Sequence, residues 1–143
     1  MTLTGTVAAL NTAYGSAGLS IQGDEAITIS DTTVDAEALN NLNNYTSGVI
    51  NADTLTKLTG TLADVNVAFA ADAASSATIS GLGDQDVELT DTNVLAADLN
   101  TLNTYTSGTV DASTVAVMEG TVSALNTAYD LSLIHISEPT RRT

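Results

Sequence analysis

Apolar and polar residues alternate in several short segments of the chain. In Ala26–Ser30 and Asp86–Thr90 every second residue is apolar, which is the period of a strand with one buried face. Val49–Ala52 and Thr109–Ala112 predict two shorter strands. We expect these segments to pack one face of each strand against a core.

Between the strands the apolar spacing changes to the three and four residues typical of a helix. Asp35–Tyr45 carries Leu39 and Leu42 on one face, has acidic residues in its first turn, and is followed by Gly48 as a stop signal. A second pattern, with Leu62, Val65 and Phe69 on one face, covers 60–70. This second pattern recurs in Gly5–Tyr14 and Gly120–Tyr129.

The chain repeats itself. Ile29–Asn66 aligns without gaps on Leu89–Asn126, and Tyr45–Gly48 recurs in the same alignment as Tyr105–Gly108. A partial copy opens the chain, five residues closer to its neighbour, and we place the difference in a loop around 70–78. The predicted organisation is a partial repeat over 1–23, a first repeat over 24–70, and a second repeat with the following half-unit over 71–130.

Helices of about ten residues are marginal on their own, so the repeats must bury their apolar faces against each other. We therefore predict an α/β fold, namely a short repeat solenoid of strand–helix units. A compact α+β domain made of two repeats is the alternative. The residues expected in the core are Leu39, Leu42, Val65, Phe69, Leu99, Leu102 and Leu125.

Charge and composition exclude several functions. The chain has 17 acidic and 3 basic residues among 143, a net charge of −14, and no cysteine. Nucleic-acid binding needs Lys and Arg to neutralise phosphates, so we expect no nucleic-acid partner. Disulfides and thiolate chemistry are excluded, and no apolar run approaches the roughly 18 residues of a membrane span.

The C-terminal segment, 131–143, differs from the repeats in composition and holds the single His, the single Pro and both Arg. Leu131–Arg141 resembles one reading frame of a transposase-type adapter used to build sequencing libraries. We therefore interpret 131–143 as a non-native tail and the chain as a translated, truncated metagenomic fragment of a longer array. A natural C-terminal tail is the alternative, and His135 receives no functional role.

Acidic turns flank the two longer predicted strands and are candidate weak calcium sites, because calcium prefers oxygen ligands. Solvated turns are the alternative, since no stretch has the pattern of an EF-hand loop. The candidate ligands are Asp24, Glu25, Asp31, Asp84, Asp86 and Asp91.

Two other rows recur with the repeat. Asn11, Asn66 and Asn126 are equivalent, as are Asn40 and Asn100 and also Asn43 and Asn103. We expect these amides to satisfy backbone groups of neighbouring coils rather than to bind a ligand. The aromatic residues also recur at helix ends, and we expect them to pack there, with stacking on sugars as the alternative. They are Tyr14, Phe69 and Tyr129 in one class, and Tyr45 and Tyr105 in the other.

Catalytic chemistry has little support in residues 1–130, which contain no His, Cys or Arg. A carboxylate pair could still perform acid–base work, so a carboxylate-only glycoside hydrolase is a remote alternative. We predict that the protein is not an enzyme and needs no cofactor.

Residues 4–130 resemble a known type of repeat through the order Asp-Thr-x-Val, Leu-Asn-x-Leu, Tyr-Thr-Ser-Gly, Gly-Thr and Asn-x-Ala-Tyr. Such units are similar to Thr/Ala/Asp-rich tandem repeats of very large surface or secreted proteins of bacteria, notably marine cyanobacteria. The resemblance implies a structural or adhesive module, extracellular or at the cell surface, whose partners are neighbouring repeats. It also implies the alternative of a glycan- or calcium-binding repeat module. No catalytic residues carry over.

Overall fold

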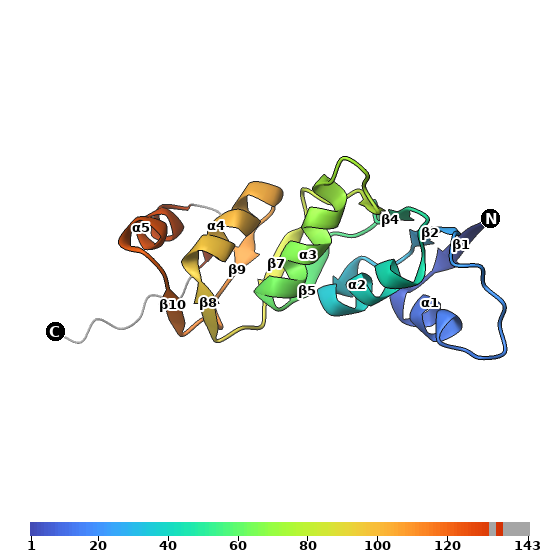
Figure 1. Ribbon diagram of the computed structural model, residues 1–143. Helices are drawn as coiled ribbons and strands as arrows, with labels where there is room; N and C mark the ends of the chain where they lie inside the picture. Colours follow the sequence, from blue (N-terminus) through green and yellow to red (C-terminus); the bar gives the residue numbers. More distant parts are fainter. Residues whose placement is uncertain (132–133, 136–143) are drawn as a thin grey trace.

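The computed structural model describes residues 1–131 and 134–135. Within them the chain forms five helices that follow one another along the molecule, each packed beside the next (Figure 1). The helices are α1 (Val7–Tyr14), α2 (Ala36–Tyr45), α3 (Leu62–Ala73), α4 (Ala96–Tyr105) and α5 (Val122–Asp130). None of the helices in this part of the chain is long and apolar enough to cross a membrane.

The strands form three sheets in which every pairing is parallel. The first sheet has the order β1 (Thr2–Gly5), β2 (Ala26–Ile29), β4 (Ile50–Asn51), β6 (Ile79–Ser80). The second has the order β11 (Ile134–His135), β9 (Val110–Asp111), β7 (Asp86–Leu89), β5 (Lys57–Gly60), β3 (Thr33–Asp35). The third pairs β10 (Val117–Glu119) with β8 (Asn93–Leu95). The predicted α/β class is confirmed.

The strand register has a nearly constant separation along the chain. Thr2 pairs with Ala26 and Thr33 with Lys57, at equal separations, whereas the separation between Lys57 and its partner Asp86 is wider by five positions. The wider step contains α3, which runs to Ala73 and is the longest of the described helices. The additional residues thus lengthen a helix as well as the loop in which we expected them.

The alternating segments form strands as predicted, with β2 and β7 ending one residue early and β4 and β9 shortened to two residues. The strands that directly precede the helices were not predicted. They are short, and their side chains alternate over only three or four positions, as in Thr33–Asp35. Such a segment becomes a strand only because a neighbour supplies the hydrogen bonds.

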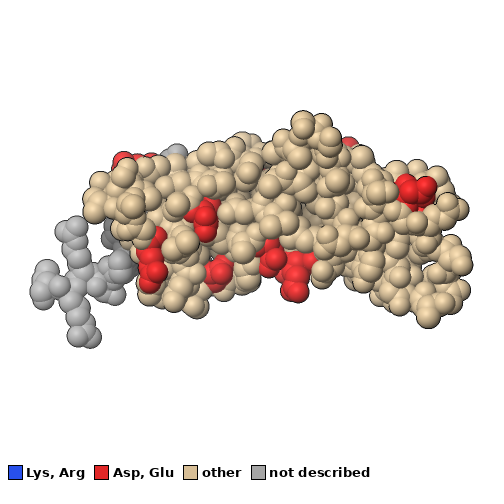
Figure 2. Space-filling view, viewed as in Figure 1, with Lys and Arg blue, Asp and Glu red and all other residues tan. Residues whose placement is uncertain are grey.

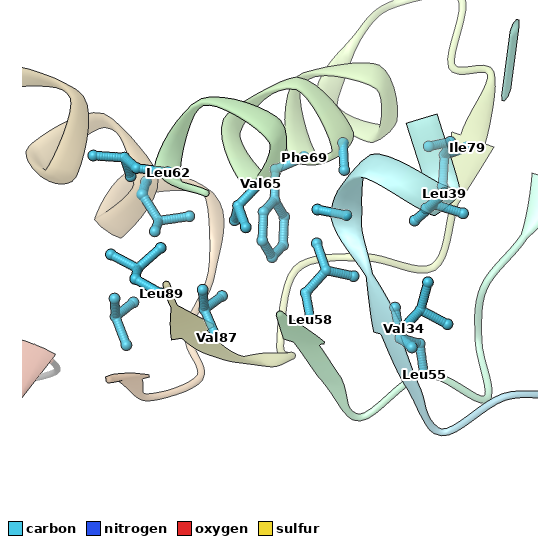
Figure 3. Close-up of a cluster of buried hydrophobic side chains, with 14 of the residues drawn as sticks. Val34, Leu39, Leu55, Leu58, Leu62, Val65, Phe69, Ile79, Val87 and Leu89 are labelled. Carbon is cyan, nitrogen blue, oxygen red and sulfur yellow. The ribbon is translucent and has the colours of Figure 1, made fainter. Parts of the chain in front are cut away.

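The core lies between the helices and the strands. Figure 3 shows Leu62, Val65 and Phe69 of α3 pointing from the helix toward Leu58, Val87 and Leu89 on the strands. Six of the seven predicted core residues are buried. The exception is Leu125, which is half-buried because it belongs to α5, the last of the described helices.

Part of the segment interpreted as an adapter-derived tail joins a sheet. Ile134 of β11 pairs with Val110 of β9, and Ile79 of β6 pairs with Ile50 of β4. Since β9 is the repeat equivalent of β4, β11 takes the position that β6 has in the earlier repeat. The interpretation of 131–143 as a non-native tail does not predict this strand. Strand pairing uses main-chain groups that every residue type offers, so the pairing does not bear on the origin of the segment. The other residues after Leu131 lie outside the described part of the chain.

Candidate functional site

The acidic side chains are dispersed over the molecule. On the face shown in Figure 2 they form several separate spots rather than one patch. Within residues 1–131 and 134–135, no three His, Cys, Asp or Glu side chains lie close enough together to hold a metal ion. The candidate calcium ligands are therefore best examined one pair at a time.

Asp31 and Asp91 each cap a helix that lies earlier in the chain. The Oδ2 atom of Asp31 accepts a hydrogen bond from the backbone N–H of Val7 at 2.8 Å, and Asp91 accepts from Leu62 at 2.6 Å. Val7 and Leu62 are the first residues of α1 and α3. The first N–H groups of a helix have no partner within the helix and carry partial positive charge, which explains an aspartate at this position.

Glu25 and Gln85 occupy equivalent positions of the two repeats, and both are buried. The Glu25 carboxylate accepts from the backbone N–H groups of Gln22 (2.8 Å) and Gly23 (2.9 Å), and from the Tyr14 hydroxyl (3.2 Å). Burial disfavours its charge, but these hydrogen bonds outweigh burial and hold the pKa of Glu25 below its ordinary value. Burial and the contact with Glu25 raise the pKa of Tyr14.

Gln85 fills the same place with a different set of hydrogen bonds. Its Oε1 accepts from the backbone N–H groups of Gly83 (2.7 Å) and Asp84 (3.2 Å). Its Nε2 donates to the carbonyl oxygens of Leu55 (3.1 Å) and Gly81 (2.9 Å), which a carboxylate could not do. Both side chains therefore bind backbone groups of this chain. Glu25 only accepts from N–H groups there, whereas Gln85 also donates to carbonyl oxygens.

The remaining candidate ligands are on the surface. Asp24 and Asp84 are exposed, and Asp86 is an exposed residue whose Oδ1 accepts from the backbone N–H of Thr109 at 2.8 Å. Hard-cation sites use six or more converging oxygens. Four of the six predicted residues thus accept side-chain hydrogen bonds from the backbone, and the other two, Asp24 and Asp84, are exposed, so the structure does not gather the six carboxylates at one point.

Asparagine side chains join every consecutive pair of the described helices. The Nδ2 of Asn11 donates to the carbonyl of Ala38, that of Asn40 to Asp64, that of Asn66 to Asp98, and that of Asn100 to Ala124, at 2.9–3.1 Å. Each donor is the fifth residue of its helix, and each acceptor is the third residue of the next. We call these four contacts the asparagine ladder. They confirm, for Asn11, Asn40, Asn66 and Asn100, the prediction that the amides satisfy backbone groups of a neighbouring element. Asn43, Asn103 and Asn126 make no such contact with the described residues.

The aromatic residues stack in pairs across neighbouring helices. The rings of Tyr14 and Tyr45 are parallel with centroids 5.6 Å apart, and those of Phe69 and Tyr105 are 6.3 Å apart. Helix-end packing is confirmed for Tyr14, Tyr45 and Tyr105, which are the last residues of α1, α2 and α4. Phe69 packs as predicted but lies inside α3, which continues to Ala73. Tyr129, in α5, is exposed.

The contacts of Thr46 and Thr106 were not foreseen. Each threonine is buried, and its Oγ1 donates at 2.7 Å to a backbone carbonyl 21 residues earlier in the chain, that of Glu25 for Thr46 and that of Gln85 for Thr106. The recurrence of Tyr-Thr-Ser-Gly marked the segment in the sequence. A threonine on its own gives no indication that its hydroxyl is buried, however.

Comparison with protein-family models, curated proteins and solved structures finds no match. The polar side chains that recur in the sequence bind the chain's own backbone, and the four ladder asparagines join each described helix to the next.

Exchanging the two buried residues at the equivalent positions should reverse the pH dependence of stability. The Gln85→Glu variant places a carboxylate against the carbonyls of Leu55 and Gly81. We expect it to lose about 1–3 kcal/mol of unfolding free energy at pH 7. The loss should shrink as the pH falls toward about 4, because a protonated carboxyl again donates a hydrogen bond. Urea unfolding followed by circular dichroism between pH 4 and 7 measures this.

The reciprocal variant, Glu25→Gln, is the matched control. Because the pKa of Glu25 is lowered in the folded state, its ionised form stabilises the fold above the unfolded-state pKa, and this contribution is lost as the pH falls through the folded-state pKa. Glu25→Gln should flatten that acid-side loss. A Gln85→Glu variant as stable as the parent at pH 7 would contradict the assigned hydrogen bonds.

Proposed function

We propose that the chain is a structural or adhesive repeat module of a large extracellular or cell-surface protein, and that its coils stack as a short α/β solenoid. The observation that carries the proposal is the asparagine ladder, in which one side-chain contact recurs at all four junctions between the described helices. Contacts that recur at each step suit an element built by repetition.

The strand register supports the same proposal. The separation between paired residues varies by at most one position along the chain, except where α3 intervenes and widens it. Each coil therefore places its strands beside those of the coil before it. A compact two-repeat domain is the alternative arrangement. Small-angle X-ray scattering distinguishes them, because a stack of coils gives an elongated particle.

A glycan- or calcium-binding module is the second candidate function. It is favoured by the acidic turns and by the exposed ring of Tyr45. Against it, the carboxylates of Glu25, Asp31 and Asp91 are occupied by backbone N–H groups. We further propose that the protein is not an enzyme and takes no cofactor, since its polar side chains recur with the repeat instead of forming one distinct group; the carboxylate-only glycoside hydrolase stays the remote alternative.

Salt and calcium separate the two candidate functions. Residues 1–130 carry 16 acidic residues and one basic residue, Lys57, whose pKa is raised by Glu88 at 2.6 Å. We expect NaCl to raise the melting temperature by screening repulsion, whose range falls from about 8 Å at physiological ionic strength to about 3 Å at 1 M. Millimolar calcium should stabilise no more than NaCl of matched ionic strength.

Magnesium at equal concentration and the Asp84→Asn variant are the controls for this experiment. A specific site would make calcium better than both NaCl and magnesium, by mass action on the folded state, and Asp84→Asn would remove part of the excess. That result would favour the calcium-binding module. Saturable binding of labelled chain to immobilised glycans, lost in Tyr45→Ala, would favour the glycan-binding one.

A further inference from the structure

Helix α5 exposes residues whose equivalents in α1 and α3 are buried. All three helices follow the same Gly-Thr pair in the sequence. The first residue of each helix is Val7 in α1 (3% exposed), Leu62 in α3 (4%) and Val122 in α5 (74%). Because the three helices have equivalent sequences, the difference in exposure of their first residues comes from the segments packed against them.

The cover of α1 and α3 has a defined chemistry. Asp31 and Asp91, two residues after the ends of β2 and β7, accept the N–H of the first helix residue. The third residue of the next helix accepts the asparagine Nδ2. A tyrosine at the end of that next helix, Tyr45 or Tyr105, stacks on the aromatic ring of α1 or α3.

α5 carries the same three groups on the same face. None of the described residues accepts the N–H of Val122, and the first turn of α5 holds no acidic residue. The positive end of the helix dipole is therefore available to a carboxylate. Asn126 and Tyr129, equivalent to the ladder asparagine and the stacking aromatic, are exposed.

The strand before α5, β10, also lacks, among the described residues, the partner that the strands before α1 and α3 have. β1 and β5, which precede α1 and α3, pair with β2 and β7. β10 pairs with β8 and has no second partner among the described strands. Its outer edge thus offers the backbone groups that β2 and β7 use elsewhere.

We propose that β10, Val122, Asn126 and Tyr129 form a docking face for one further strand–turn–helix segment with the layout of residues 86–105. The inference rests on the proposed function as a repeat module and names its partner. The incoming strand pairs in parallel with β10, and an aspartate two residues after that strand accepts the Val122 N–H. The carbonyl oxygen of the third residue of the incoming helix accepts a hydrogen bond from Nδ2 of Asn126, and the tyrosine at the end of that helix stacks on Tyr129. This docking would continue an interface that α1 with α2 and α3 with α4 already form.

The test extends the chain by one repeat. Residues 131–143 are replaced by a second copy of 71–130, which joins α5 at the point where the same segment joins α3. Hydrogen exchange of the Val122 amide is measured by NMR, with the Val7 and Leu62 amides as internal standards. We expect protection of Val122 to rise at least tenfold over both the full chain and a chain ending at Asp130.

A matched control removes one group from the cover. Asp91→Ala in the added copy alone should abolish most of the protection at Val122 and leave Val7 and Leu62 unchanged. If the added copy folds while Val122 exchanges as fast as in the full chain, the docking face is wrong, although separately folded repeats would still allow the proposed function. Docking together with saturable glycan or calcium binding would overturn the structural function instead.

A second measurement covers an extended chain that does not fold. A peptide of residues 78–108, added in excess to the labelled full chain, should shift the amide signals of Val122 and Asn126, and the Asp91→Ala peptide should not. Shifts spread evenly over the surface, or equal shifts with both peptides, would overturn the proposal.

Discussion

Replacing Leu42 with alanine is expected to lower the free energy of unfolding by about 2–5 kcal/mol. Leu42 lies on the inner face of α2 and is fully buried. Alanine is an excellent helix former, so the loss comes from the cavity and the apolar contacts and not from the helix itself. Urea unfolding at equal protein concentrations measures it.

The matched control for this variant is Leu19→Ala. Leu19 is the same residue type but is 58% exposed in the connection after α1, and surface changes of this kind are usually within about 0.5 kcal/mol. Equal effects of the two substitutions would mean that α2 does not face the core, and would contradict the helix packing described above.

Gly48→Ala is expected to be similarly severe, with a loss of about 3 kcal/mol. A Cβ atom at Gly48 would lie 2.3 Å from the carbonyl oxygen of Glu25 and 2.7 Å from the backbone nitrogen of Ala26. Both are main-chain atoms, so the backbone at Gly48 and the backbone at Glu25 and Ala26 must move apart, which also strains the hydrogen bond from Thr46 to Glu25. Thermal and urea unfolding of the variant measure the effect.

Gly18→Ala is the control for the glycine, because no atom lies within 4 Å of a Cβ built there. Its stability should stay within about 0.5 kcal/mol of the parent. Gly108→Ala should reproduce the Gly48 result, since its Cβ would meet the Gln85 carbonyl oxygen at 2.3 Å. If Gly48→Ala is as well tolerated as Gly18→Ala, the close approach of Gly48 to the backbone of Glu25 and Ala26 is wrong.

The role of Gly48 illustrates what sequence reasoning missed. The sequence indicated a helix stop, but α2 ends at Tyr45 with Thr46 as its C-cap, and Gly48 is not among the glycines with positive φ. The glycine is required because the backbone of Glu25 and Ala26 passes too close for a side chain. Local patterns contain no information about such an approach.

The candidate calcium residues show the same limit. Their clustering along the chain suggested oxygen ligands, whereas Asp31 and Asp91 cap the starts of α1 and α3, which lie well before them in the chain. An aspartate is suited to either role. Which role it takes depends on the groups that the fold brings near the carboxylate. The sequence pattern does not show that the N–H at the start of α1 lies beside Asp31.

The sequence by itself determined the helices, the two longer alternating strands, six of the seven core residues that it named, and the role of four asparagines in binding backbone groups. These follow from side-chain period, because the face a residue occupies is set by local backbone geometry. Only the tertiary structure decided the short strands, the aspartate caps and the atoms that pair in the asparagine ladder. Asn11 and Ala38, for example, belong to different helices and are far apart in the chain. Their hydrogen bond exists because packing of apolar faces stacks α1 on α2, and partners of that kind are specified by the stack rather than by either residue.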